Sequence, residues 1–284
     1  LMETTKVKAL YFDVSKPHAS NNIYAGSGIR IDGGRPLPTT NFLGTRQMLR
    51  RIYTLLREKH PDGRIFFHMS GQVIMPCWSF CDALVDGENY HSLLDRKNNR
   101  GYENVLRLDQ FAAEYAGQNN FGPYGVKLPQ FGRSGAIRGD EWEEIGYQPA
   151  EYLLGLIFLH NSQIWFPAYI APEPTVGVYW AFDKHGLDSQ YDFIGYWKQT
   201  AVALPEKLKA SFYVAPQKDK AFMLVMNLAG DDRPLTLDVD AENVDVSKAA
   251  SWRELYPEET EATKGTRIDG AEIGAHNFKL FLLE

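Results

Sequence analysis

The stretch Ala9-Leu10-Tyr11-Phe12-Asp13-Val14 is a short apolar run that ends on a carboxylate. Two later runs have the same form: residues 64–68 end on His68, and residues 79–88 end on Glu88. Short apolar runs of this kind are typical of buried strands. In α/β barrels the chemistry lies at the carboxyl ends of the strands. Each run therefore predicts a strand that delivers a polar side chain to a site.

Strand-like and helix-like segments alternate from about Val7 to Trp197. The spacing of apolar residues predicts helices over residues 41–59, 102–115, 149–160 and 173–185. The four or five strand–helix units are fewer than the eight of a closed (β/α)8 barrel. We therefore predict an α/β fold that is a (β/α)8-type barrel or only its C-terminal half, with an open α/β sheet as the alternative.

The pattern of apolar residues changes near Leu204-Pro205, where the helical spacing ends. Short strand-like segments separated by polar turns follow, as in residues 211–214, 221–227 and 235–239. Short strands at regular spacing are typical of an antiparallel β-sandwich. We predict two domains, an α/β domain over residues 1–203 and an all-β sandwich over residues 204–284.

The overall composition limits the class of protein. The chain has 284 residues, of which 44% are hydrophobic, and a formal net charge of −6. Nucleic acid is an unexpected partner because phosphate binding needs a basic patch. No apolar run is long enough to span a bilayer, so no membrane contact is predicted.

The N-terminus has no signal-peptide character and opens almost directly onto a core strand. We expect the chain to be the C-terminal portion of something longer. Its partner would be the missing N-terminal part or a second copy. The sequence does not fix the compartment, although a secreted or periplasmic location fits the enzyme class proposed below.

No metal or cofactor is predicted from the motifs. The two cysteines, Cys77 and Cys81, lie four residues apart without the further Cys or His that a zinc site requires. We expect two buried free thiols. The glycines after the first strand do not form a nucleotide fingerprint, and no Walker A, HExxH, GxSxG or EF-hand spacing occurs.

Two carboxylates are the candidate catalytic residues. Hydrolysis of a glycosidic bond needs one protonated and one charged carboxyl group on either side of the bond. Asp13 is assigned as nucleophile or base and Glu88 as acid, with Gly87 freeing the backbone to turn at the strand end. A turn or capping role for Asp13 is the alternative. Asp82 is an alternative partner, unless it serves to bond a neighbouring strand or an arginine.

Five further residues are candidates for substrate binding: His68, Asp86, Asn22, Trp165 and His160. His68 could hydrogen-bond a substrate hydroxyl or tune a carboxylate, and a structural role is the alternative. His160 ends an apolar helix, where C-terminal capping also explains it. Asn22 lies in a long Gly-rich loop over residues 15–40, and loops of such length are commonly functional.

Several segments together resemble a known family. They are Tyr11-Phe12-Asp13, the helix with residues 44–53, the strand ending His68-Met69-Ser70, and Ser79-Phe80-Cys81-Asp82 leading to Gly87-Glu88. The set resembles the C-terminal portion of large bacterial glycoside hydrolase-like proteins. These are similar to family 123 enzymes and, more distantly, to α-amylase-like barrels.

The resemblance covers most of residues 7–200 and implies a carbohydrate substrate, such as a polysaccharide, and a C-terminal sandwich. Family 123 enzymes use a neighbouring Asp-Glu pair and the substrate's acetamido group. This chain has no such dipeptide at a strand end, since Asp140-Glu141 falls in a predicted loop. The substrate-assisted mechanism is therefore not implied here.

We predict a glycoside hydrolase-like protein. One rival is a non-catalytic carbohydrate-binding or scaffold protein that keeps the hydrolase fold, because fold alone does not decide function. The other rival is a hydrolase that acts on a different polar substrate with a metal bound at Asp13, His68 or Glu88.

Overall fold

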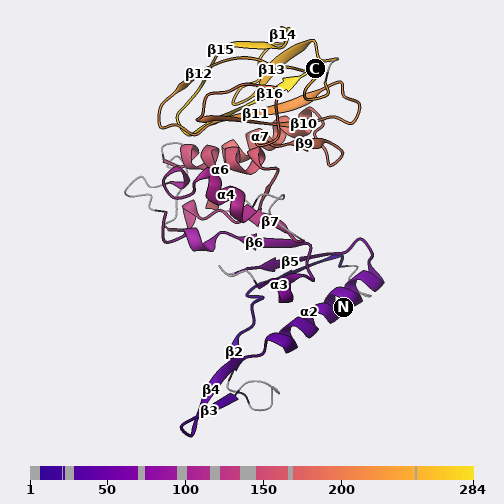
Figure 1. The fold of residues 1–284 in the computed structure, drawn as a ribbon, viewed down its shortest axis with the longest axis vertical. Coiled ribbons are helices and arrows are strands. Elements are labelled where there is room, and N and C mark those ends of the chain that lie inside the picture. The colour runs from indigo at the N-terminus through magenta and orange to yellow at the C-terminus, as the bar shows by residue number, and fades with distance from the viewer. Residues whose placement is uncertain are drawn as a thin grey trace. The chain divides into compact units, whose positions relative to one another are not determined.

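The structure, a computed structural model, describes residues 7–20, 22, 29–69, 74–94, 101–115, 122–134, 145–165, 169–246 and 248–284. The chain forms two compact units, Leu1–Asn89 with Asn120–Leu128 and Tyr90–Asn119 with Pro129–Glu284 (Figure 1). None of the described helices combines the length and the apolar character that crossing a bilayer would require. The domain boundary near residue 204 stays a prediction.

Parallel strands form the core of the first unit. In spatial order they are β1 (Ala9–Phe12), β5 (Arg64–His68), β6 (Ala83–Asp86) and β7 (Tyr124–Lys127). All three neighbouring pairs are parallel. The predicted strands at the start of the chain, before His68 and before Glu88 are therefore present. Because the strands are parallel, their carboxyl ends meet at one edge of the sheet.

Two helices cover this sheet, α2 (Phe42–Lys59) and α3 (Met75–Trp78). The Asn41 side chain caps α2 by accepting a hydrogen bond of 2.9 Å from the backbone N–H of Gly44. Leu49 and Leu56 of α2 are buried against the strands, in a cluster that includes both free cysteines. Burying one leucine side chain stabilises the fold by about 1.5–3 kcal/mol. The expected helix and the expected buried thiols are confirmed.

Residues 15–40 were expected to form an irregular loop, and this expectation is wrong. They contain a small antiparallel sheet of β2 (Ala19–Ser20), β3 (Ile29–Asp32) and β4 (Arg35–Thr40), in the order β2-β4-β3. Gly33 and Gly34 make the turn between β3 and β4 with φ angles of +55° and +81°. Glycine adopts these angles without steric cost, so Gly33 and Gly34 close a hairpin.

The second unit opens with helical segments. They are η2 (Glu88–Tyr90), shared with the end of the first unit, η4 (Tyr102–Asn104), α4 (Leu108–Tyr115), η6 (Phe131–Ser134), α6 (Tyr147–Leu159) and α7 (Pro172–Lys184), with the short strand β8 (Gln163–Ile164) between the last two. The predicted helix over residues 102–115 is split into η4 and α4. The helix α6 is buried on all sides, as its continuous apolar sequence predicts.

Antiparallel strands complete the second unit. The larger sheet has the order β14-β13-β16-β11-β10-β9, and β12 pairs with β15 in a second sheet. Their bounds are β9 (Asp192–Ile194), β10 (Leu208–Val214), β11 (Ala221–Asn227), β12 (Arg233–Asp238), β13 (Ser251–Tyr256), β14 (Thr263–Lys264), β15 (Arg267–Ile273) and β16 (Phe278–Leu283).

The strand β11 shows how this sheet is covered on both faces. Phe222 and Leu224 belong to a cluster with α6 and α7, whereas Met223 and Val225 belong to a cluster with β12 and β15. Successive residues of a strand point to opposite faces, so a strand buried on both faces reads as a continuous apolar run. The predicted order of a parallel α/β sheet followed by antiparallel strands is confirmed.

Candidate active site

Ionisable side chains stand at the carboxyl ends of four neighbouring parallel strands. Asp13 directly follows β1, while His68, Asp86 and Lys127 are the last residues of β5, β6 and β7. Glu88 begins η2, two residues beyond β6. This edge of the sheet is where α/β barrels place their reacting groups. The first unit thus gathers five ionisable side chains on the edge where a site is expected.

The imidazole of His68 contacts two carboxylates. Its Nδ1 lies 3.0 Å from Asp13 Oδ1, and its Nε2 lies 3.4 Å from Glu88 Oε2. The His68 side chain is only 7% exposed, whereas those of Asp13 and Glu88 are 66% and 33% exposed. A buried ring therefore joins two carboxylates that reach toward solvent.

The two ring nitrogens of His68 are not equally satisfied. Nδ1 also lies 3.0 Å from the Tyr11 hydroxyl, but Nε2 makes no hydrogen bond to any described residue. A neutral imidazole carries one proton, so it can donate toward only one of its two carboxylate neighbours. If Nδ1 donates to Asp13, the Nε2 lone pair faces Glu88 Oε2. The alternative is a charged ring that donates to both.

Tyr11 is a fourth member of this cluster. Burial raises the pKa of its phenol to about 12, and the negative charges of Asp13 and Glu88 add to the rise. Both carboxylates are thus close enough to act on one hydroxyl group. The signal that sequence reasoning missed is that Tyr11 precedes Asp13 by two residues, which places both side chains on the same side of the strand.

The backbone around Asp13 and Glu88 is specialised. Val14 has a φ angle of +48°, which is rare for a β-branched residue, and its N–H donates to Asp13 Oδ1 at 2.8 Å. Ser15 Oγ donates to the backbone oxygen of His68 at 2.8 Å. Gly87 has a φ angle of +151°, and a Cβ there would lie 2.0 Å from the backbone oxygen of Leu128. Only glycine fits at the turn that leads to Glu88.

The contacts to His68 limit the separation of the two carboxylates. Since these contacts are 3.0 and 3.4 Å long and one imidazole ring lies between them, the two oxygens are within about 9 Å of each other. Carboxyl pairs in glycosidases are separated by about 5 Å when they retain and up to about 9.5 Å when they invert the anomeric configuration. The geometry therefore suits a carboxylate pair that acts on one bond.

Asp86 and Lys127 end two neighbouring strands at the same edge of the sheet. Both are buried, and they are register partners on the neighbouring parallel strands β6 and β7. Asp86 Oδ1 makes no hydrogen bond to any described residue. Lys127 is a further residue that sequence reasoning missed, although its signal was present as a basic side chain at the end of a predicted strand. The substrate-binding role of Asp86 stays a prediction.

Asp82 has a structural position. One of its carboxylate oxygens pairs with Arg57 of α2, and the other accepts a hydrogen bond of 2.8 Å from the backbone N–H of Ile65. It lies just before β6, at the opposite end of that strand from Glu88. This is the bonding to a neighbouring strand and an arginine that was the alternative to a catalytic role.

The other predicted binding residues have separate surroundings. Asn22 is exposed just after β2, and its N–H donates to Ser20 Oγ at 3.1 Å. Trp165 and His160 belong to the second unit, Trp165 half-buried after β8. His160 is buried at the end of α6, with Nδ1 2.7 Å from the backbone oxygen of Leu156, so it caps that helix. Substrate binding by these three residues stays a prediction.

No metal-binding arrangement was found in the part of the chain that the structure describes: no group of three or more His, Cys, Asp or Glu side chains there is placed to hold an ion.

Comparisons with known proteins show the fold. No protein-family model matches the sequence, and no curated protein matches it. The structure is similar to a maltogenic α-amylase from Thermotoga neapolitana, with a TM-score of 0.52 at 9% identity over 97% of this chain and 77% of the amylase. It is also similar to a Bacillus halodurans protein provisionally named α-N-acetylgalactosaminidase, with a TM-score of 0.51 at 11% identity over 97% and 74%.

An α-amylase from Anoxybacillus matches with a TM-score of 0.49 at 9% identity, over 84% of this chain and 56% of the amylase. The chain thus spans just over half of that protein's length. At such low identities these similarities concern the fold. The shared fold is a parallel α/β sheet followed by antiparallel C-terminal sheets, and the predicted fold class is confirmed.

Proposed function

We propose that this chain is a glycoside hydrolase-like protein that cleaves a glycosidic bond with the carboxyl groups of Asp13 and Glu88. The observation that carries the proposal is that one buried imidazole, that of His68, contacts both carboxylates at the carboxyl edge of a parallel sheet. The carbohydrate substrate is inferred from this pair, with the likeness in fold as support.

The surroundings of the two carboxylates support different roles. Glu88 is the less exposed and faces an imidazole nitrogen, which suits a carboxyl group that carries a proton. Asp13 is more exposed and accepts from the Val14 N–H, which suits a charged carboxylate. In the reaction, Glu88 would give its proton to the glycosidic oxygen as the bond to the anomeric carbon breaks. Asp13 would attack that carbon or take a proton from the attacking water.

His68 would connect the proton donation by Glu88 with the step that Asp13 carries out. Its Nε2, which lies 3.4 Å from Glu88 Oε2 and makes no hydrogen bond to a described residue, is available to a substrate hydroxyl. A ring held by Asp13 on one side and facing Glu88 on the other would place the two carboxyl groups in different surroundings. That difference is what a catalytic carboxyl pair needs.

The test is a hydrolysis screen on a panel of aryl glycosides that compares the wild type with Asp13→Asn and Glu88→Gln. Loss of general acid or nucleophile function costs about 10²–10⁴-fold in rate, and we expect both variants to lose activity on that scale. Asp62→Asn is the matched control, since this exposed carboxylate belongs to the same unit and pairs with Lys8.

Unchanged turnover in both variants would remove Asp13 and Glu88 from the reaction. A wild type that binds oligosaccharides but hydrolyses no member of the panel would favour the non-catalytic carbohydrate-binding alternative.

A further inference from the structure

One face of α7 in the second unit is exposed among the residues that the structure describes. Val178 and Phe182 on its inner side are buried in the core shared with α6 and the antiparallel sheet. On the outer side Val176 is 62% exposed and Trp180 is 59% exposed. Large apolar side chains gathered on the surface often mark a binding site.

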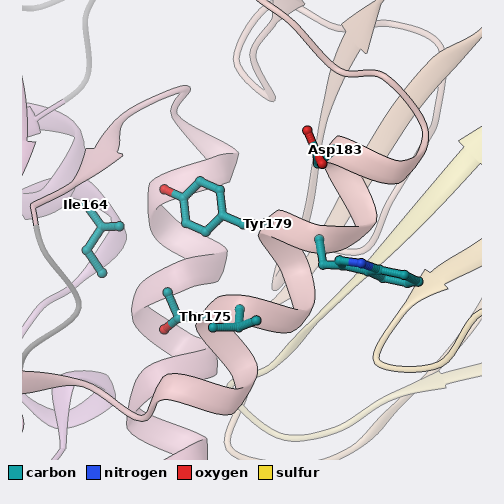
Figure 2. Close-up of a pocket in the computed structure, with 6 residues that line it drawn as sticks. Ile164, Thr175, Tyr179 and Asp183 are labelled. Carbon is teal, nitrogen blue, oxygen red and sulfur yellow. The ribbon is translucent and has the colours of Figure 1, made fainter.

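A cavity of about 480 Å³ lies against this face. Its lining consists of Ile164, Thr175, Val176, Tyr179, Trp180 and Asp183. Figure 2 shows that Tyr179 points toward Ile164, while Asp183 lies one turn further along α7. Small-molecule sites in proteins measure about 300–1,000 Å³, so the cavity has the size of such a site.

The ring of Trp180 has a cationic neighbour. Lys184 Nζ lies 5.0 Å from the centre of the indole ring, and the same ammonium group pairs with Glu259. Cation–π attraction orients an aromatic ring. An aromatic surface that is fixed before a ligand arrives loses little conformational entropy on binding.

We propose that this α7 groove, defined by the six residues named above, binds a neutral oligosaccharide without cleaving it. The C–H faces of a sugar ring would stack on the negative face of the indole of Trp180. The carboxylate of Asp183 would accept hydrogen bonds from sugar hydroxyls. The proposal goes beyond the chemistry of Asp13 and Glu88, since every residue of the groove belongs to the second unit.

The charges around the groove favour an uncharged ligand. Asp183 lies at one end of the exposed face, and Glu173 in the first turn of α7 is also exposed. The positive charge of Lys184 is balanced by Glu259. An anionic glycan or an acidic peptide would meet two carboxylates, while the ammonium group of Lys184 that lies beside them is already paired with Glu259.

The size of the apolar surface argues against a protein partner. Specific protein interfaces bury about 800 Å² and some 20–30 residues on each side. Here the exposed apolar part of the lining is Val176 and Trp180. A sugar of a few rings fits such a surface, whereas a second protein would need apolar contacts over a wider area.

The test is isothermal titration calorimetry with four probes: maltoheptaose, cellohexaose, xylohexaose and chitohexaose. The protein carries Asp13→Asn and Glu88→Gln, so that turnover cannot consume the probe, and the substitutions at Trp180 show whether binding is at the α7 groove. We expect at least one probe to bind, and Trp180→Ala in this background to weaken its Kd by roughly tenfold or more. Trp180→Phe should retain most of the affinity because it keeps an aromatic face.

Leu43→Ala is the matched control, because Leu43 is a highly exposed apolar residue of α2 in the first unit, and its removal should leave the Kd unchanged. The proposal is overturned if none of the four probes binds, or if Trp180→Ala binds as tightly as its parent. It is also overturned if size-exclusion chromatography with light scattering shows self-association that Trp180→Ala abolishes, since the face would then be a protein interface. None of these outcomes depends on whether Asp13 and Glu88 are catalytic.

Discussion

His68 Nδ1 lies 3.0 Å from Asp13 Oδ1, although 55 residues separate the two in sequence. The pairing of β1 with β5 explains this contact. Phe12 and Phe67 are register partners in that parallel pair, so the residues that follow them are brought side by side. The sheet itself therefore fixes the contact, which makes it a rigid foundation for a site.

Two substitutions of His68 separate its two contacts. In His68→Asn the side-chain amide can replace Nδ1 and still reach Asp13, while in His68→Gln it can replace Nε2 and reach Glu88. If His68 holds the proton of Glu88, then His68→Asn should lower kcat by about 10²-fold, with KM less affected. His68→Gln should keep more of the activity.

Steady-state kinetics over a range of pH on the best aryl glycoside would check this prediction. A purely structural His68 would give equal losses in both variants and an unchanged pH profile. Thermal unfolding of the two variants is the control, because both bury a neutral amide at the same position.

The parts of the fold and site that sequence could predict are those fixed by local patterns. Asp13, His68 and Glu88 were found because each ends an apolar run, and such a run signals a buried strand. The pairing of strands is not local, which is why the contact of Tyr11 with His68 and the register pairing of Asp86 with Lys127 could not be predicted. The capping role of His160 was recognised as an alternative because it depends only on the end of one helix.

Tyr11→Phe removes one hydroxyl group from the cluster and nothing else. The hydroxyl lies 3.0 Å from His68 Nδ1, so its loss should leave the ring less firmly placed and lower kcat by roughly tenfold. The pKa of Tyr11 is raised to about 12, so the phenol stays protonated up to that pH. The alkaline limb of the pH profile should therefore coincide in wild type and variant below pH 10.

The same pKa has a consequence for stability. Because the folded pKa lies above the unfolded value of 10.0, the unfolded state ionises first, and the contribution of Tyr11 to stability is lost as pH rises from 10 toward 12. Urea unfolding of wild type and Tyr11→Phe at pH 8 and pH 11 would measure it. If Tyr11→Phe lost as much stability between pH 8 and pH 11 as the wild type does, the raised pKa of Tyr11 would be contradicted.

Gly87→Ala should disrupt the site because the new side chain would clash with the backbone. A glycine substitution in the first unit that creates no backbone clash should have a smaller effect. The new Cβ would lie 2.0 Å from the Leu128 backbone oxygen, and backbone atoms cannot move aside as a side chain can. We expect a destabilisation of about 3 kcal/mol or more. Gly34→Ala is the matched control, since it also has a positive φ angle, +81°, but meets no atom within 4 Å.

Gly34→Ala should cost only the conformational strain, about 1–2 kcal/mol. Denaturant unfolding followed by circular dichroism would compare the two variants. Equal losses would mean that Gly87 is required for its backbone angle alone and that the close approach to Leu128 has little effect.

His160 gives the second unit a dependence on acid pH. Burial lowers the pKa of His160 to about 4 from the usual value of 6.5. The unfolded chain therefore takes up a proton below about pH 6.5 while the folded protein does not, so stability falls as pH drops from 6.5 toward 4. For one such group the loss is about 2 kcal/mol at pH 5.

The prediction is checked by urea unfolding at pH 7.5 and pH 5 in the wild type, in His160→Phe and in His18→Gln. Phenylalanine can keep the aromatic contacts with Trp197 and Phe111 but cannot take up a proton. His160→Phe should be less stable than the wild type at pH 7.5, because the hydrogen bond to Leu156 is lost, yet it should lose about 2 kcal/mol less between the two pH values. The exposed His18 serves as the control, and its variant should follow the wild type. Since all other groups contribute equally to the three proteins, an equal pH dependence in His160→Phe would show that His160 is protonated in the folded state.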